Sequence, residues 1–266
     1  MEISIGDHHW QVTTFGSGKK VLVAFHGYGQ DSSWFKHHEE VLGESYTIYA
    51  IDLAYHGAQS NLPKGIEFDE LYARRWLESI LSKCGESQIG LLGYSIGARI
   101  AMTIASWMPE AISELWLIAP DGMPVSKTYR FLIGNFLGKA VFKSFISSPN
   151  FAFLLLSAGS RSGLLSKKVA AFYKNEIASI SKRQKLYDTW MAYRTALPNY
   201  AEIHKQVVRK HLHITCILGK DDRVIPLKRT RNFAMKKIGS VELIELELGH
   251  NLLSDKGARL LSDYWK

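Results

Sequence analysis

The stretch GLLGYSIGARIAM, residues 90–102, places the pattern Gly-x-Ser-x-Gly between an apolar run and a segment of helical periodicity. This order predicts a buried strand that turns sharply at Ser95 and continues as a helix. Such a turn projects the serine Oγ clear of the backbone at the carboxyl end of a sheet. Gly93 and Gly97 flank the turn, where a Cβ would collide with the neighbouring strand or helix. The free N–H groups of the helix start favour negative charge, so the Ile96 N–H is a natural donor to an oxyanion.

The five-residue pattern by itself is weak support for a catalytic serine, since it occurs by chance in roughly one chain in ten of this length. The strand before it and the helix after it raise its value. A serine hydroxyl needs a base within hydrogen-bond reach before it can act as a nucleophile, and a carboxylate must orient that base. The rest of the chain therefore has to supply a histidine and an acid.

The composition is that of a globular protein with one large domain, or with a core that carries an insertion: 266 residues, 46% hydrophobic and 22% charged. Cys84 and Cys216 lie far apart and indicate neither a disulfide framework nor a metal site. The first residues lack a basic segment followed by an apolar one, so no secretory signal is visible and we expect a cytoplasmic protein. Polar residues and Pro149 interrupt the apolar stretch 131–156, which is not expected to span a membrane.

The positive charge is concentrated in one segment. Residues 121–185 contain eleven Lys and Arg but only two acidic residues, a net charge of +9, whereas the rest of the chain has a net charge of −1. The segment is also rich in aromatic residues. We therefore expect a core formed by 1–120 and 206–266, and a basic helical insertion at 121–205.

Strands and helices alternate along the core. Strands are predicted at 21–25, 46–53, 112–119, 212–218 and 241–248, besides the strand before Ser95, and the weakly alternating residues 2–15 predict a strand or hairpin. Residues 69–84 predict an amphipathic helix with Leu71, Trp76, Ile80 and Leu81 on one face. This alternation predicts an α/β protein with a doubly wound, mostly parallel sheet, whose sites lie at the carboxyl ends of its strands.

Five motifs follow predicted strands, and together they resemble the α/β-hydrolase superfamily, whose order is nucleophile, acid, histidine. They are the oxyanion-loop motif at 26–29 (HGYG), the loop at 52–60 (DLAYHGAQS), which is similar to the family's Asp-x-x-x-His-Gly-x-Ser, the serine elbow at 93–97, Gly-x-x-Asp-x-x-x-Pro at 219–226, and Gly-His at 249–250. The resemblance covers about residues 20–120 and 210 to the end. It implies the α/β-hydrolase fold, with 121–205 as a variable helical lid.

The resemblance also assigns roles. It implies Ser95 as nucleophile, His250 as base and Asp222 as the acid that orients the base. Asp121 is one alternative for the acid, because some members of the superfamily place the acid after the earlier strand. Asp221 is the other.

The backbone N–H groups of Tyr28 and Ile96 are expected to form the oxyanion hole, and Tyr28, Tyr94 and Arg99 are expected to contact substrate. We expect His26 and His56 to hold loops rather than to take part in catalysis. No metal, cofactor or nucleic-acid partner is implied, and the sequence does not predict the oligomeric state.

The implied activity is a serine hydrolase that cleaves a carboxylic ester or thioester of a small to medium apolar acyl group through an acyl-enzyme. A serine rather than an aspartate at the elbow argues against dehalogenation and epoxide opening. Arg99 would suit a lyase of menaquinone biosynthesis, whose elbow is similar, or else it is a helix surface residue. A C–C bond hydrolase is a further alternative. An intact triad argues against a non-catalytic ligand-binding protein. The basic lid leaves open an anionic substrate or a weak contact with an anionic surface.

Overall fold

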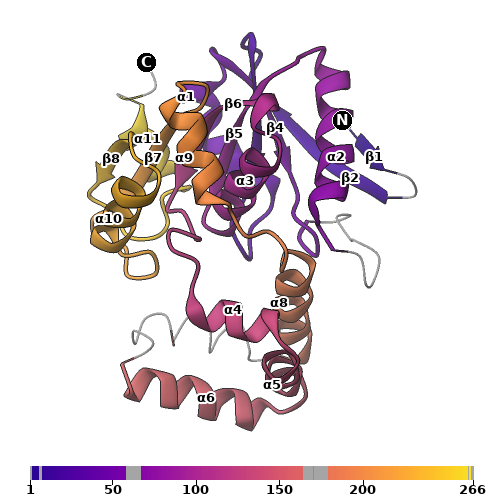
Figure 1. Cartoon of the computed structure of the whole chain (residues 1–266), viewed down its shortest axis with the longest axis vertical. Coiled ribbons are helices and arrows are strands. Elements are labelled where there is room, and N and C mark those ends of the chain that lie inside the picture. The colour runs from indigo at the N-terminus through magenta and orange to yellow at the C-terminus, as the bar shows by residue number, and fades with distance from the viewer. Residues whose placement is uncertain are drawn as a thin grey trace. The chain divides into compact units, whose positions relative to one another are not determined.

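The structure is a computed structural model that describes residues 2–5, 8–57, 67–163, 170, 179–262 and 264. The chain divides into two compact units, Met1–Pro124 with Thr195–Lys266, and Val125–Arg194 (Figure 1). Residues 121–124 and 195–205, which were predicted to belong to the insertion, lie in the first unit. The role of the second unit as a lid stays a prediction. No helix in the described part of the chain is long and apolar enough to cross a membrane.

One sheet forms the centre of the first unit. Within the described residues it has eight strands in the order β1-β2-β4-β3-β5-β6-β7-β8. Their bounds are Glu2–Ile5 (β1), His8–Phe15 (β2), Lys20–Phe25 (β3), Tyr46–Ile51 (β4), Ile89–Tyr94 (β5), Ile112–Ile118 (β6), His213–Gly219 (β7) and Glu242–Leu246 (β8). The pairings β1–β2 and β2–β4 are antiparallel and all others are parallel, which confirms the predicted doubly wound, mostly parallel sheet.

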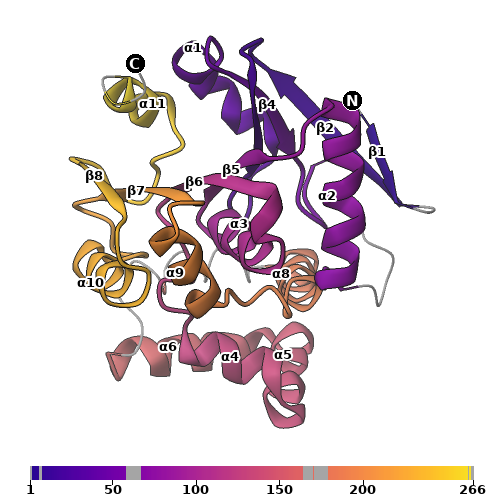
Figure 2. The ribbon, with the colours of Figure 1, turned by 45° about the horizontal axis from the view of Figure 1, so that its top comes forward.

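Helices cover both faces of this sheet, which is why its central strands are buried almost throughout. In Figure 2, α1 and α11 lie on one face, and α2, α3, α9 and α10 lie on the other. The helices of this unit are the 3₁₀ helices Ser32–His38 (η1) and Pro109–Ala111 (η2), and the α-helices Glu39–Leu42 (α1), Glu70–Cys84 (α2), Ile96–Trp107 (α3), Tyr200–Val208 (α9), Leu227–Lys237 (α10) and Asp255–Leu261 (α11).

Helix α2 buries a different face from the one predicted. Its buried residues are Tyr72, Ala73, Trp76, Leu77 and Ile80, whereas Leu71 is 59% exposed. An aromatic cluster sets this orientation, since the indole of Trp10 on β2 packs against the rings of Tyr72 and Trp76. The indole N–H of Trp10 also donates to the Tyr72 hydroxyl at 2.8 Å. The prediction was correct for Trp76 and Ile80 but wrong for Leu71.

The second unit is helical in its described part. Its helices are Lys127–Gly134 (α4), Phe136–Ser147 (α5), Pro149–Arg161 (α6) and Ile180–Ala192 (α8). Phe142 is central to their packing, with its ring centroid 5.0 Å from that of Tyr187 and 5.1 Å from that of Trp190. The Arg183 side chain donates from Nε to the Ile146 carbonyl at 2.8 Å, which links α8 to α5. Part of the aromatic content of this segment therefore forms the core of the unit.

Candidate active site

Ser95 lies at the turn between β5 and α3, as predicted. Its backbone has φ 53° and ψ −115°, and its side chain makes no capping bond to the helix. A positive φ in a residue with a Cβ costs about 1–3 kcal/mol, so the surrounding structure has to hold it in place. Two backbone hydrogen bonds do so: the Ser95 N–H donates to the Ile118 carbonyl at 3.0 Å, and the Asp121 N–H donates to the Ser95 carbonyl at 3.1 Å.

The flanking glycines are needed for the close approach of backbone segments. A Cβ at Gly93 would lie 2.4 Å from the Cα of Ala98 in the following helix. A Cβ at Gly97 would lie 2.1 Å from the carbonyl oxygen of Phe25 at the end of β3. Both separations are far shorter than van der Waals contact. Gly93 thus avoids a collision with the helix, and Gly97 avoids one with the neighbouring strand, as the sequence predicted.

His250 and Asp222 are in direct contact. The Nδ1 of His250 lies 2.7 Å from Oδ2 of Asp222, although the two residues follow different strands. The other carboxylate oxygen accepts the N–H groups of Val224 and Ile225, both at 2.8 Å. The Asp222 side chain is only 1% exposed, whereas that of His250 is 24% exposed. Because Nδ1 is held by the carboxylate, Nε2 is the ring nitrogen left to exchange protons with a substrate or a nucleophile.

The alternative acids occupy other positions. Asp121 places Oδ2 3.6 Å from a guanidinium nitrogen of Arg99, and Asp221 is exposed. Neither makes a hydrogen bond to His250 in the described part of the chain. Arg99 is only 1% exposed, so the helix-surface alternative was wrong for it. Its contact with substrate stays a prediction.

Tyr94 contacts the candidate base rather than solvent. Its hydroxyl donates to the His250 carbonyl at 2.8 Å, and the two ring centroids are 5.4 Å apart. The residue is 5% exposed. Burial, and then the negative charge of Asp222, raises the pKa of the Tyr94 phenol above its ordinary value, so the phenol stays neutral and can donate. A contact of Tyr94 with substrate stays a prediction, and its contact with His250 was not predicted from the sequence.

Two histidines hold the loop that follows β3. His26 accepts the Leu53 N–H at Nε2 (2.9 Å), so its Nδ1 carries the proton and donates to the Gly27 carbonyl at 2.7 Å. His56 accepts the Gly29 N–H at Nε2 (3.0 Å), and its Nδ1 donates to the Ala54 carbonyl. Both rings are thus fixed as neutral tautomers.

Tyr28, whose N–H is the predicted second oxyanion donor, lies between Gly27 and Gly29. His26 contacts the first of these glycines and His56 the second. The loop around it is therefore held at both ends. Residues 58–60 of the 52–60 motif lie outside the described residues.

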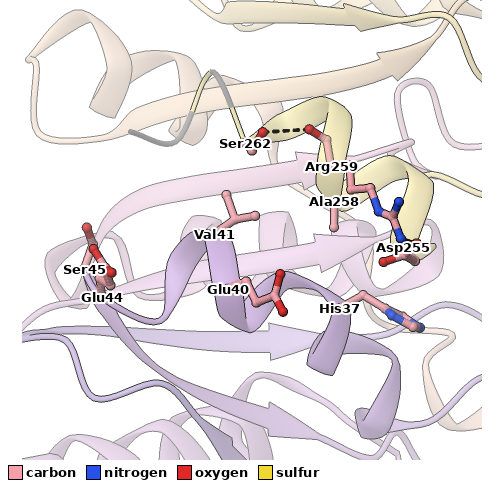
Figure 3. Close-up of a pocket in the computed structure, with 9 residues that line it drawn as sticks. All are labelled: His37, Glu40, Val41, Glu44, Ser45, Asp255, Ala258, Arg259 and Ser262. Atoms are coloured by element: carbon pink, nitrogen blue, oxygen red, sulfur yellow. Dashed lines mark hydrogen bonds and ion pairs between the residues drawn. The ribbon is translucent and has the colours of Figure 1, made fainter.

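A separate groove lies beside η1, α1 and α11 (Figure 3). Its volume is about 580 Å³ and its lining is mostly polar, with His37, Glu40, Glu44, Asp255 and Arg259 among its residues. Ser95, Asp222 and His250 do not line it. In the described ranges no three His, Cys, Asp or Glu side chains are grouped so as to hold a metal ion.

A family model described as the alpha/beta hydrolase fold matches residues 20–256. The chain therefore belongs to the α/β-hydrolase family. A pimeloyl-(acyl-carrier protein) methyl ester esterase of Aliivibrio fischeri is 29% identical over 111 residues, which is 42% of this chain and 39% of that protein. The first curated relatives are thus matched over about a third to two fifths of their own length.

Solved structures resemble the whole chain. A thermophilic esterase from Thermogutta terrifontis has a TM-score of 0.66 at 16% identity, covering 99% of this chain and 97% of that one. A thioesterase domain from the curacin biosynthetic pathway has a TM-score of 0.65 at 17% identity, covering 100% and 98%. At such low identity these likenesses show the shared fold alone.

Proposed function

We propose that the chain is a serine hydrolase that cleaves a carboxylic ester or thioester with Ser95, His250 and Asp222. The observation that carries this proposal is the 2.7 Å hydrogen bond between His250 Nδ1 and Asp222 Oδ2. Ser95, Asp222 and His250 follow three parallel strands of one sheet, β5, β7 and β8, so all three belong to the carboxyl edge of that sheet. The strained serine turn adds support, because strain of this kind is found at functional sites.

The proposed reaction proceeds by acyl transfer. His250 Nε2 takes the proton of the Ser95 hydroxyl while Oγ attacks the carbonyl carbon, and Asp222 stabilises the imidazolium that forms. The Tyr28 and Ile96 N–H groups stabilise the oxyanion, each contributing about 3–4 kcal/mol in comparable sites. Collapse of the tetrahedral intermediate breaks the bond to the alcohol or thiol, which leaves with the proton from His250. Water then hydrolyses the acyl-enzyme by the same steps.

The proposed substrate carries a small to medium apolar acyl group. The esterase name of the Aliivibrio relative supports an ester, although the match covers only part of that protein. The role of the second unit as a lid over Ser95 belongs to this proposal and depends on the sequence pattern. The lyase alternative required Arg99 to bind a carboxylate-rich substrate. That reading loses support because Arg99 is buried and already pairs with Asp121.

The test is covalent labelling with a fluorophosphonate probe, together with hydrolysis of a short-chain aryl ester. We expect wild type to be labelled, and Ser95→Ala to lose both labelling and turnover. Ser113→Ala is the matched control, because it removes a part-buried hydroxyl on β6 whose single hydrogen bond among the described residues goes to the Ile89 carbonyl. Labelling of Ser95→Ala as strong as that of wild type would contradict the proposal.

A further inference from the structure

The second unit contains almost no negative charge. Between residues 122 and 175 the sequence has eight Lys and Arg residues and neither Asp nor Glu. The five described cations of this stretch are Lys127, Arg130, Lys139, Lys143 and Arg161. None of them has a carboxylate within 4.0 Å among the described residues.

The surface of the first unit differs in this respect. Several of its cations are paired with carboxylates, in the ion pairs Lys36–Glu39, Arg74–Glu70, Lys205–Glu202, Lys220–Glu247, Arg231–Glu245 and Arg259–Asp255. A mixture of both signs is what keeps an ordinary surface electrostatically balanced. The cations of α4, α5 and α6 lack that balance, so their field extends into solvent and attracts anions.

Large apolar side chains protrude beside these cations. Phe136 is 89% exposed, Leu137 is 64% exposed and Phe131 is 43% exposed. They are brought together because the start of α5 packs on the end of α4: a Cβ at Gly138 would lie 1.9 Å from the carbonyl oxygen of Phe131. The Asn135 side chain fixes the junction by accepting the Gly138 N–H at 2.7 Å. Figure 1 shows the two helices meeting at this point.

Lys143 belongs to the same surface, because it follows Phe136 by seven residues, or two helical turns, and is exposed. On α4, Lys127 and Arg130 are also exposed. We call Lys127, Arg130, Phe131, Phe136, Leu137 and Lys143 the α4–α5 corner. Aromatic and leucine side chains surrounded by unpaired cations are typical of segments that bind the interface of a membrane.

We propose that the α4–α5 corner docks on a membrane surface that contains anionic lipids. Phe136 and Leu137 enter the boundary between headgroups and acyl chains, while the lysine and arginine side chains stay among the headgroups. A bilayer accepts protruding apolar side chains without a matching pocket. A second copy of the same corner fits less well, because it would bring the cations of both copies together. This inference goes beyond the proposed function and does not depend on it.

The test is co-sedimentation of the full chain with phosphatidylcholine vesicles, with and without phosphatidylglycerol. We expect binding that requires the anionic lipid and weakens when NaCl is raised from about 0.05 M to about 0.5 M, because salt screens the attraction. The double change Phe136→Ser with Leu137→Ser should lower the partition coefficient by about tenfold or more. The double change Arg130→Gln with Lys143→Gln should lower binding to vesicles that contain phosphatidylglycerol and leave binding to pure phosphatidylcholine vesicles unchanged.

Matched controls come from the first unit. Leu71 and Met235 are 59% and 55% exposed, so Leu71→Ser and Met235→Ser remove similar apolar area elsewhere. They should change vesicle binding by less than about twofold. The proposal is overturned if wild type does not bind anionic vesicles, or if it binds neutral vesicles equally well. It is also overturned if the Phe136–Leu137 variant binds like the controls, or if light scattering shows that this variant dissociates a dimer while vesicle binding is unchanged.

Discussion

The Tyr94 hydroxyl donates a 2.8 Å hydrogen bond to the backbone carbonyl of His250, and the two rings lie 5.4 Å apart. Tyr94 immediately precedes Ser95, so the end of β5 carries the candidate nucleophile and also the residue that holds the loop of the candidate base. Gly27 leaves room for the phenol, since a Cβ there would lie 2.7 Å from two of its ring carbons. One ring thus contacts the loop after β3 and the loop after β8.

This relationship predicts that Tyr94 positions His250. Tyr94→Phe keeps the ring and removes the hydrogen bond to the carbonyl, so the His250 loop loses a restraint. We expect kcat on an aryl ester to fall by about tenfold, equivalent to about 1.4 kcal/mol, with KM nearly unchanged. The measurement is steady-state kinetics of wild type and Tyr94→Phe, with their Tm values recorded beside them.

The matched control for this prediction is Tyr46→Phe. The Tyr46 hydroxyl donates to Glu114 at 3.0 Å, and the residue is 6% exposed, close to the 5% of Tyr94. It lies at the amino end of β4, away from the strand ends that carry the site. The two variants should lose similar stability, but only Tyr94→Phe should lose kcat. An equal kcat for the two variants would show that Tyr94 does not position the base.

The carboxylate of Asp222 is predicted to set the tautomer of His250. In Asp222→Asn the side-chain oxygen can still accept the Val224 and Ile225 N–H groups, which turns the amide NH₂ toward His250 and favours the wrong tautomer. The loss in turnover should be about 10⁴-fold, as for triads of this kind. Asp121→Asn and Asp221→Asn, assayed at saturating ester, are the comparison. A large loss for Asp121→Asn with little for Asp222→Asn would reverse the assignment of the acid.

Much of the fold could be predicted because its signals are local. The strands before Ser95 and Asp222 are mostly apolar, and the strand before His250 alternates apolar residues with glutamates, so the order of the motifs already placed the three residues at one sheet edge. The contact between Tyr94 and His250 has no local signature, since 156 residues separate the two in the chain. The same holds for Arg99, for which the sequence predicted a contact with substrate or else a place on the helix surface, but not the pairing with Asp121. Likewise, the buried face of α2 depends on Trp10, which lies in a distant strand.

The backbone conformation of Ser95 predicts that glycine is more stable than alanine at this position. At φ 53° and ψ −115° a Cβ is unfavourable, so Ser95→Gly should relieve strain that Ser95→Ala keeps. We expect Ser95→Gly to have a free energy of unfolding about 1 kcal/mol higher than that of Ser95→Ala, measured with urea. Within α3 the backbone is helical and the order should be the opposite, so Ser106→Gly, in the last turn of the helix, should be less stable than Ser106→Ala by up to about 1 kcal/mol. Equal stability of the two Ser95 variants would mean that the turn is not strained.

The last prediction concerns pH and His38, which is fully buried at the end of η1. Burial, with a smaller contribution from the charge of His37, lowers the pKa of His38 from 6.5 to about 3. Between these two values the unfolded chain binds a proton at this position and the folded chain does not. The free energy of unfolding should therefore fall as the pH is lowered through this window, by about 1.4 kcal/mol per pH unit at its steepest.

His38→Gln removes the titrating group, so its free energy of unfolding should depend less steeply on pH between about 6 and 4 than that of wild type. This expectation concerns the slope and holds even if the substitution lowers stability at every pH. His37→Gln is the matched control, because His37 is the exposed neighbour of His38 and its removal leaves the buried imidazole in place. Urea unfolding of the three proteins at several pH values gives the slopes. If wild type and His38→Gln have the same slope, the folded chain already binds a proton at His38 in this range, and burial does not exclude it.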